Sequence, residues 1–338
     1  MNKTIKPFST TGIGSLPHKI SLDAAELVLK SVDIPFWPQL PNLSFKESMI
    51  TQFSEGMPFV RVNEAEKNIV VIRDASDQLE RFYEAYSEST KIAISEDYAK
   101  GLHTFIKIIK KRRFEFLKGH VTGPLTFTLS LKDNYGRPIF FDEELREIST
   151  MILKAKARWQ IELLRQHADN VIIFIDEPIL SAIGGSAYLG VDPDETLRLL
   201  REMVKAVQTA GGIAGIHCCG KADWALVLKS GVSILSFDAY DYSESLAIYH
   251  KEVKDFLKAG NYLSWGIVPT SEIIQHLEER QIISLMNNAM EGFYNNISPE
   301  LIKSRVLLTP ACGTASRTIG ESTKIFQLLM RLKESFES

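Results

Sequence analysis

The sequence predicts an α/β protein, a single (β/α)8 TIM barrel over residues 1–338 with an inserted hairpin and extra helices. Three observations predict this fold. Short β-branched runs alternate with longer amphipathic segments, there are eight such runs, and no stretch rich in Pro, Gly and Ser divides the chain. With 45% apolar residues the chain can bury one large core. A doubly wound parallel sheet is the alternative fold for the same alternation.

The predicted elements follow one another along the whole chain. The eight strands are 9–15, 34–40, 114–122, 171–176, 212–219, 234–239, 262–268 and 305–311. Helical periodicity is clearest at 142–168, 194–210, 245–259, 278–293 and 319–335. Polar residues between two β-branched runs predict an inserted hairpin at 59–74, and 75–112 and 124–168 hold more helix than a minimal barrel requires.

Composition excludes several classes of protein. A net charge of −3 argues against a nucleic-acid-binding protein, which normally carries a basic face. No apolar run approaches the roughly 20 residues that span a bilayer. The N-terminus has no apolar signal core, so a cytoplasmic protein is expected. Three cysteines do not suit a disulfide framework, and cysteines close to a histidine indicate metal ligands or a nucleophile.

Reactive side chains gather where the predicted strands end, which in barrels is the active-site mouth. They are Ser15, Asp176 with Glu177, His217 with Cys219, Asp238 and Cys312. Scattered surface residues would not be expected to collect at this one kind of position.

The pair His217 and Cys219 carries the sharpest signal. Residues i and i+2 of a strand share a face, so Cys218 points the other way. One imidazole and one thiolate form half of a zinc site, and Cys312 can supply a second thiolate. Asp238 can supply a fourth ligand or give its place to substrate. The alternative interpretation is a small apolar cysteine pair beside a hydrogen-bonded core histidine.

The motif IDEP at 175–178 ends a strand with two carboxylates. By alternation only one of them faces the lumen. We predict that Asp176 binds a cationic group and that Glu177 turns towards a neighbouring strand or loop. A helix cap or a surface charge is the alternative.

A glycine-rich turn, TTGIGSLP at 10–17, lets backbone N–H groups and the Ser15 hydroxyl approach an anion closely. It lacks the dinucleotide fingerprint GxGxxG. A carboxylate-binding turn and an ordinary tight turn both remain open, as they do for TGPLT at 122–126. Three further residues are placed near the predicted mouth: Glu47, His120 and Arg317.

These motifs resemble the catalytic barrel of cobalamin-independent methionine synthase, in the wider barrel group that includes uroporphyrinogen decarboxylase and the corrinoid-linked methyltransferases. The matching pieces run in the family's order from residue 10 to residue 317: TTGIGSLP, TGPLT, FIDEP, HCC with Asp238 after it, and PACG. The resemblance implies that His217, Cys219 and Cys312 bind zinc. Asp238 stands where the family has a glutamate ligand.

The resemblance also implies the substrate, homocysteine. Asp176 falls on the aspartate that holds the amino group, and Ser15 with the backbone of Ile13 falls on the turn that holds the carboxylate. We group Glu47 with these substrate-binding residues. The reacting group would be the zinc-bound substrate thiolate, positioned by Asp176.

Two departures from the family concern the methyl donor. The two-barrel enzymes are about twice as long, and the stretch that carries their folate-activating histidine reads SWGIVPTS here, at 264–271. Both favour the short "core" type of methionine synthase. Methylcobalamin or another methylcorrinoid, free or on a corrinoid protein, is therefore the expected donor, and methyltetrahydrofolate is less favoured.

Three alternative functions stay open. A zinc methyltransferase could act on another thiol such as coenzyme M. A metal-free decarboxylase like uroporphyrinogen decarboxylase would want arginines in the first 30 residues, which contain none. A zinc-stabilised binding module would normally close its site with four sulfur or nitrogen ligands.

Overall fold

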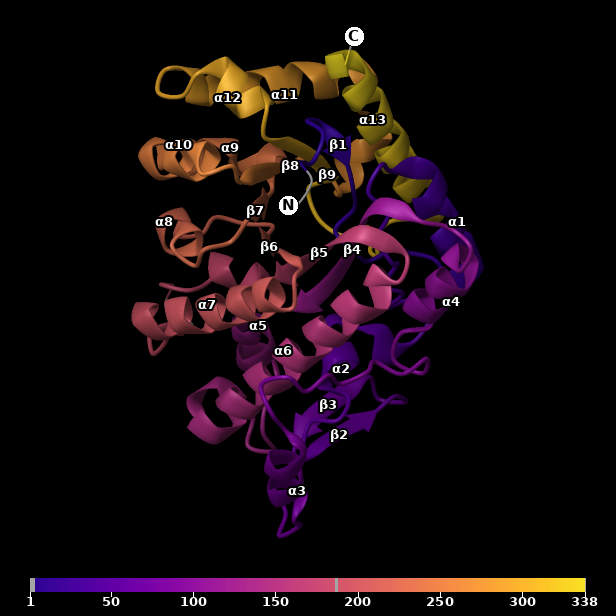
Figure 1. Cartoon of the computed structure of the whole chain (residues 1–338), viewed down its shortest axis with the longest axis vertical. Coiled ribbons are helices and arrows are strands. Elements are labelled where there is room, and N and C mark those ends of the chain that lie inside the picture. The colour runs from indigo at the N-terminus through magenta and orange to yellow at the C-terminus, as the bar shows by residue number, and fades with distance from the viewer. Residues whose placement is uncertain (1–3, 186–187, 338) are drawn as a thin grey trace.

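A parallel β-sheet forms the centre of the computed structural model, which describes residues 4–185 and 188–337. In the described residues the sheet has seven strands in the order β1-β9-β8-β7-β6-β5-β4, with helices around it (Figure 1). The strands are β1 (Ser9–Thr10), β4 (Phe114–Thr122), β5 (Ala168–Asp176), β6 (Ile213–Cys218), β7 (Ile234–Phe237), β8 (Tyr262–Val268) and β9 (Val306–Pro310). This α/β half-barrel is TIM-barrel-like.

The second predicted strand, 34–40, is an extended segment without a regular ladder. It makes isolated parallel bridges at Phe36 with Lys118 of β4 and at Gln39 with Ser15. Two residues in this segment, Pro35 and Pro38, lack a backbone N–H and interrupt strand pairing. The segment therefore lies between the edge strands β1 and β4, which it contacts through Ile34 and Phe36, but it forms no continuous strand.

Four long helices lie where periodicity predicts them: α6 (Glu143–Arg165), α7 (Pro193–Thr209), α11 (Glu279–Tyr294) and α13 (Ile319–Glu337). Two others are α4 (Lys100–Ile109), within the helix-rich stretch 75–112, and α1 (Ser21–Ser31), which was not predicted. Shorter ones are α2 (Met49–Ser54), α3 (Gln78–Ala85), α5 (Pro124–Ser130), α8 (Trp224–Leu228) and α12 (Pro299–Lys303). The single helix predicted at 245–259 is wrong: α9 (Ala239–Ala247) and α10 (His250–Lys258) divide at Ile248 and Tyr249. Both of those residues are weaker helix formers than Ala or Leu.

The inserted hairpin is confirmed. β2 (Val60–Asn63) pairs antiparallel with β3 (Asn68–Val71). In Figure 1 this hairpin and α3 extend to one end of the molecule, away from β7, β8 and β9. Among the described residues no helix is long and apolar enough to cross a membrane.

Two apolar clusters stabilise the fold. The larger one packs the helices against the sheet. The smaller one gathers side chains from several strands, among them Ile172, Phe174, Ile234 and Leu307, and Ile213 packs against it. On β5 and β6 these residues precede Asp176 and His217 at steps of two, so they share the face that carries the predicted site.

Candidate metal centre

Three predicted zinc ligands converge in the structure. One ligand atom each from His217, Cys219 and Cys312 lies within 4.8 Å of the other two. His217 is on β6, Cys219 follows that strand directly, and Cys312 follows β9. Two other strands, β8 and β7, separate β9 from β6 in the sheet, so its curvature brings these residues together.

The ring of His217 is oriented by Ser236, its register partner on β7. Nδ1 of His217 lies 3.0 Å from the Ser236 hydroxyl. Nε2 is buried and has no hydrogen-bond partner in the described part of the chain. A metal-ligating histidine typically hydrogen-bonds through one ring nitrogen and presents the other to the ion. Sequence reasoning missed Ser236, although it precedes Asp238 by two and so shares its face.

The pKa values of the two clustered cysteines shift in opposite directions. A hydrogen bond from Cys312, and then the nearness of His217, lowers the pKa of Cys219 to about 4. The same hydrogen bond and burial raise the pKa of Cys312. An imidazole and two cysteine sulfurs form a donor set that Zn²⁺ binds well once both thiols have lost their protons.

Cys218 points away from this cluster, as strand alternation predicts. Its side chain is fully buried in the larger apolar cluster, and its thiol donates to the Gly220 carbonyl over 3.7 Å. Burial raises its pKa to about 12. Cys218 therefore acts as a small apolar residue.

Asp238 lies outside the group of three ligands. Its carboxylate caps α9 by accepting the backbone N–H of Asp241 at 3.0 Å. Burial raises its pKa to about 6, and the nearby Cys219 also raises it. Its role as fourth ligand stays a prediction.

The Asp176 carboxyl is close to the metal centre. Asp176 is the register partner of His217 on the neighbouring strand. Its Oδ1 atom is buried without a hydrogen-bond partner among the described residues. Burial raises its pKa to about 6, while His217 and Lys118 act in the opposite direction. A ligand that brought a positive charge would satisfy this carboxyl.

Glu177 turns away from the lumen, as predicted. Its carboxylate accepts the backbone N–H groups of Leu125 at 3.0 Å and Thr126 at 2.7 Å, and the Thr126 hydroxyl at 2.6 Å. A Cβ atom on Gly123 would lie only 2.1 Å from this carboxyl group, which explains the glycine of TGPLT. Glu177 thus fixes the loop after β4.

The turn at 10–17 borders the Cys312 loop. The Ser15 carbonyl accepts the Thr314 N–H at 2.8 Å, and a Cβ atom on Gly313 would lie 2.1 Å from the Ser15 hydroxyl oxygen. The Ile13 carbonyl accepts a hydrogen bond from the Lys118 ammonium at 2.5 Å. The structure therefore brings Ser15 beside the clustered cysteine and links Ile13 to the barrel interior.

The three remaining predicted residues are placed as follows. Both oxygens of Glu47, which is fully buried, accept backbone N–H groups, from Leu40 at 3.0 Å and Lys100 at 2.9 Å. His120 is buried and stacks on Trp37, with ring centroids 3.8 Å apart. The backbone N–H of Arg317 donates to Thr314. None of the three belongs to the metal cluster.

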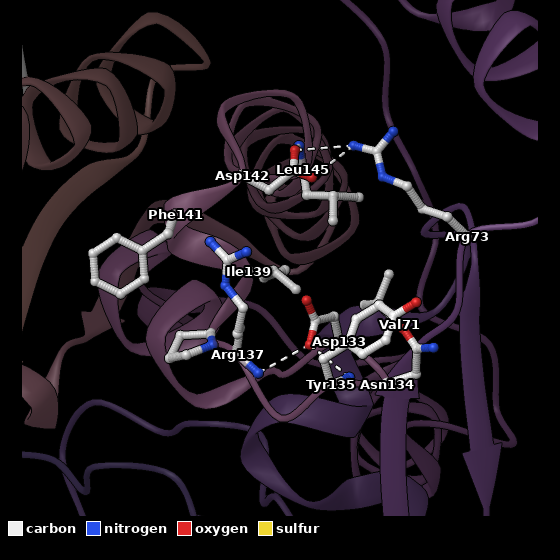
Figure 2. A pocket seen from close by; sticks show the side chains of 11 residues that line it. Val71, Arg73, Asp133, Asn134, Tyr135, Arg137, Ile139, Phe141, Asp142 and Leu145 are labelled. Atoms are coloured by element: carbon white, nitrogen blue, oxygen red, sulfur yellow. Dashed lines mark hydrogen bonds and ion pairs between the residues drawn. The ribbon is translucent and has the colours of Figure 1, made fainter.

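A separate cavity of about 500 Å³ lies between the hairpin and the loop before α6. Figure 2 shows its lining, in which Arg73 pairs with Asp142 while Asp133 accepts the backbone N–H groups of Tyr135 and Arg137. It contains no predicted site residue, because its lining is Val71, Arg73, Asp133, Asn134, Tyr135, Arg137, Pro138, Ile139, Phe141, Asp142 and Leu145.

Fold and site together define a TIM-barrel-like α/β protein with a candidate His/Cys/Cys metal centre. Its structure is similar to that of a B12-independent methionine synthase from Shewanella sp. W3-18-1, solved in complex with selenomethionine. The TM-score is 0.58, the match covers 98% of each chain, and 13% of residues are identical. At that identity the similarity shows a shared fold.

Other comparisons add little. An amidohydrolase crystal structure matches 68% of this chain and 63% of its own, with 16% identity and a TM-score of 0.26, too low to support an argument. No protein-family description matches the sequence. A search of characterised proteins finds no match either.

Proposed function

We propose that this chain is a zinc-dependent methyltransferase, a single cytoplasmic (β/α)8 barrel that moves a methyl group to the thiol of homocysteine and so forms methionine. One observation carries the proposal. A histidine with a free buried Nε2 and two cysteines form a metal-ligand cluster directly beside a buried, unsatisfied Asp176 carboxyl. A metal with a buried carboxyl group on the neighbouring strand suits a thiol whose other end carries an ammonium group.

His217, Cys219 and Cys312 would hold the zinc, and Asp238 would be its fourth ligand after releasing the cap of α9. Bound zinc lowers the pKa of a thiol ligand, which supplies thiolate at neutral pH. Asp176 binds the ammonium group of homocysteine and fixes the direction from which the thiol approaches. The backbone at Ile13 and the Ser15 hydroxyl bind its carboxylate, and Glu47 holds the loop beside them.

For the methyl donor we propose a methylcorrinoid such as methylcobalamin, free or on a corrinoid protein. Chain length does not separate the donors, because the Shewanella enzyme, described as B12-independent, is covered over 98% of its chain. The proposal rests instead on β8 and the residues after it, 262–271, which contain no histidine. The next histidine along the chain, His276, is exposed.

The test is a methyl-transfer assay with the purified, zinc-loaded protein and homocysteine. We expect methionine from methylcobalamin and little from methyltetrahydrofolate. Methionine from the folate alone would overturn the donor while keeping the transferase. No methionine from either donor, with zinc bound, would contradict the proposed reaction.

A second candidate acceptor is a sulfonate thiol such as coenzyme M. The observation that favours it is the buried ammonium of Lys118, a positive charge near Asp176. Asp176→Ala separates the two acceptors. Loss of homocysteine binding in this variant supports the amino acid, and unchanged binding supports the sulfonate thiol.

A further inference from the structure

The strongest feature that zinc chemistry leaves unexplained is Lys118, a lysine in the middle of β4. Its side chain is fully buried. Its ammonium donates to the Ile13 carbonyl at 2.5 Å and lies 4.3 Å from the centre of the Phe174 ring. Burying an ammonium group costs free energy that a single carbonyl and a ring face do not fully offset.

Asp176 is the carboxyl whose charge acts on this ammonium, although the two groups form no direct ion pair in the described structure. Burial lowers the pKa of Lys118, and the Asp176 carboxyl raises it. Buried charged groups often cost a protein more stability than apolar side chains of similar volume would. A buried ammonium near a buried carboxyl that keeps an oxygen without a partner among the described residues is therefore better explained by a ligand than by stability.

Lys118 also connects the two ends of the proposed amino-acid site. Through its hydrogen bond it holds the turn at Ile13, which is proposed to bind the carboxylate. Through its charge it acts on Asp176, which is proposed to bind the ammonium group. The same side chain thus holds the turn while opposing the negative charge that attracts an amine.

We propose that Lys118 is a positioning residue that makes the site selective for thiols carrying a carboxylate, an assignment that rests on the proposed homocysteine methyltransferase function. Removing its charge should loosen the carboxylate-binding turn at Ile13 while leaving Asp176 free to attract an amine. Carboxylate recognition should then be lost without loss of zinc or of amine recognition.

The experiment is calorimetric titration of the zinc-loaded protein with three thiols: homocysteine, 4-mercaptobutanoate, which lacks the amino group, and 3-mercaptopropylamine, which lacks the carboxylate. In Lys118→Met we expect homocysteine and 4-mercaptobutanoate to bind about tenfold more weakly, the scale of one charge-assisted hydrogen bond. Binding of 3-mercaptopropylamine should be unchanged or tighter. A merely structural role would weaken all three thiols alike, and that result would overturn the assignment.

The matched control is Lys156→Met on α6. Lys156 is also fully buried, and its ammonium has no partner among the described residues, but it lies near Glu55 instead of Asp176. This variant should bind all three thiols as the wild type does. If it reproduced the selective loss, the effect would not belong to Lys118.

Two outcomes keep this inference separate from the proposed function. If the wild type binds homocysteine no more tightly than either analogue, the proposed function fails. If it does bind homocysteine more tightly and Lys118→Met retains that preference, only the Lys118 assignment fails. Should Lys118→Met not fold, Lys118→Gln takes its place in the three titrations. The ¹⁵N signal of the wild-type Lys118 ammonium, recorded with each thiol, is a second test that needs no variant. That signal should shift more with the two carboxylate thiols than with the amine thiol, and the reverse order would overturn the assignment.

Discussion

The two ends of the barrel strands differ in how well their inward-facing groups are satisfied. In the middle of β5, Ile172 belongs to a closed apolar cluster, and Ile213 at the start of β6 packs against it. Four residues further along each strand, Asp176 and His217 are register partners, and each has a buried polar atom without a partner in the described structure. Within four residues, the inward face of each strand therefore changes from apolar core to candidate site.

The apolar part of each strand contributes to stability, and the polar carboxyl end is available for ligand binding. Apolar burial at the amino ends contributes to folding, while unsatisfied polar atoms at the carboxyl ends cost free energy until a ligand binds. Such costs are expected at functional sites, where a ligand completes the missing interactions. Substitutions at the two ends should consequently affect different measurements.

The largest effect is expected for Cys219→Ser at the carboxyl end. Loss of one thiolate ligand should weaken zinc binding by roughly a thousandfold, because several kcal/mol of the binding free energy comes from each ligand. Competition with a chromophoric chelator measures this affinity. Cys218→Ser is the control and should keep its zinc, because its thiol lies in the apolar cluster on the other face. Equal loss in both variants would contradict the proposed ligand set.

At the amino end, Ile234→Ala should lower the free energy of unfolding by about 2–5 kcal/mol, since it opens a cavity in a fully buried cluster. Urea denaturation of the zinc-loaded protein measures it. Zinc content at low temperature should remain at the wild-type value. Loss of zinc from the folded variant would show that the two ends of the lumen are not independent.

Strand alternation with His217 predicted that Cys219, and not Cys218, faces the site. For Asp176 and Glu177 it predicted only that one of the two faces the lumen, and the choice of Asp176 was a separate hypothesis. A period of two is a local property that needs no knowledge of the tertiary fold. The contact between Lys118 and Ile13 was not predictable in this way, because it joins residues 105 apart in the chain.

Other features required the three-dimensional structure or a closer look at the sequence. The irregular second strand was foreseeable, since its two prolines are visible in the sequence. The cap that Asp238 makes on α9 could not be predicted from the sequence. A carboxylate at a strand end can bind a metal or cap the following helix, and only the geometry decides between them.

At the substrate side of the site, Asp176→Asn should weaken homocysteine binding about 10–100-fold, the scale of losing a hydrogen bond between buried charged groups. Zinc content should not change. Calorimetry and metal analysis of the same sample measure both quantities. Asp223→Asn, on the exposed cap of α8, serves as the control and should bind homocysteine normally. Wild-type homocysteine affinity in Asp176→Asn would contradict the proposal that Asp176 binds the ammonium group.

The smallest effect is expected for Ser236→Ala. Without the hydroxyl at Nδ1 the His217 ring is less well oriented, and zinc affinity should fall about tenfold. Ser264→Ala is the matched control, since this buried serine is the register partner of Ser236 on β8 but pairs with Thr309. Ser264→Ala should keep wild-type zinc affinity, and an equal loss in both variants would remove Ser236 from the metal centre.

The central claim is a zinc ion on His217, Cys219 and Cys312 that accepts the thiol of homocysteine. X-ray absorption at the zinc edge counts its sulfur neighbours directly. We predict two sulfur atoms, one from each clustered cysteine, at about 2.3 Å from zinc in the free protein. Saturating homocysteine should add one more sulfur at a similar distance. A protein that binds no zinc, or one whose sulfur count does not change with homocysteine, would contradict the account.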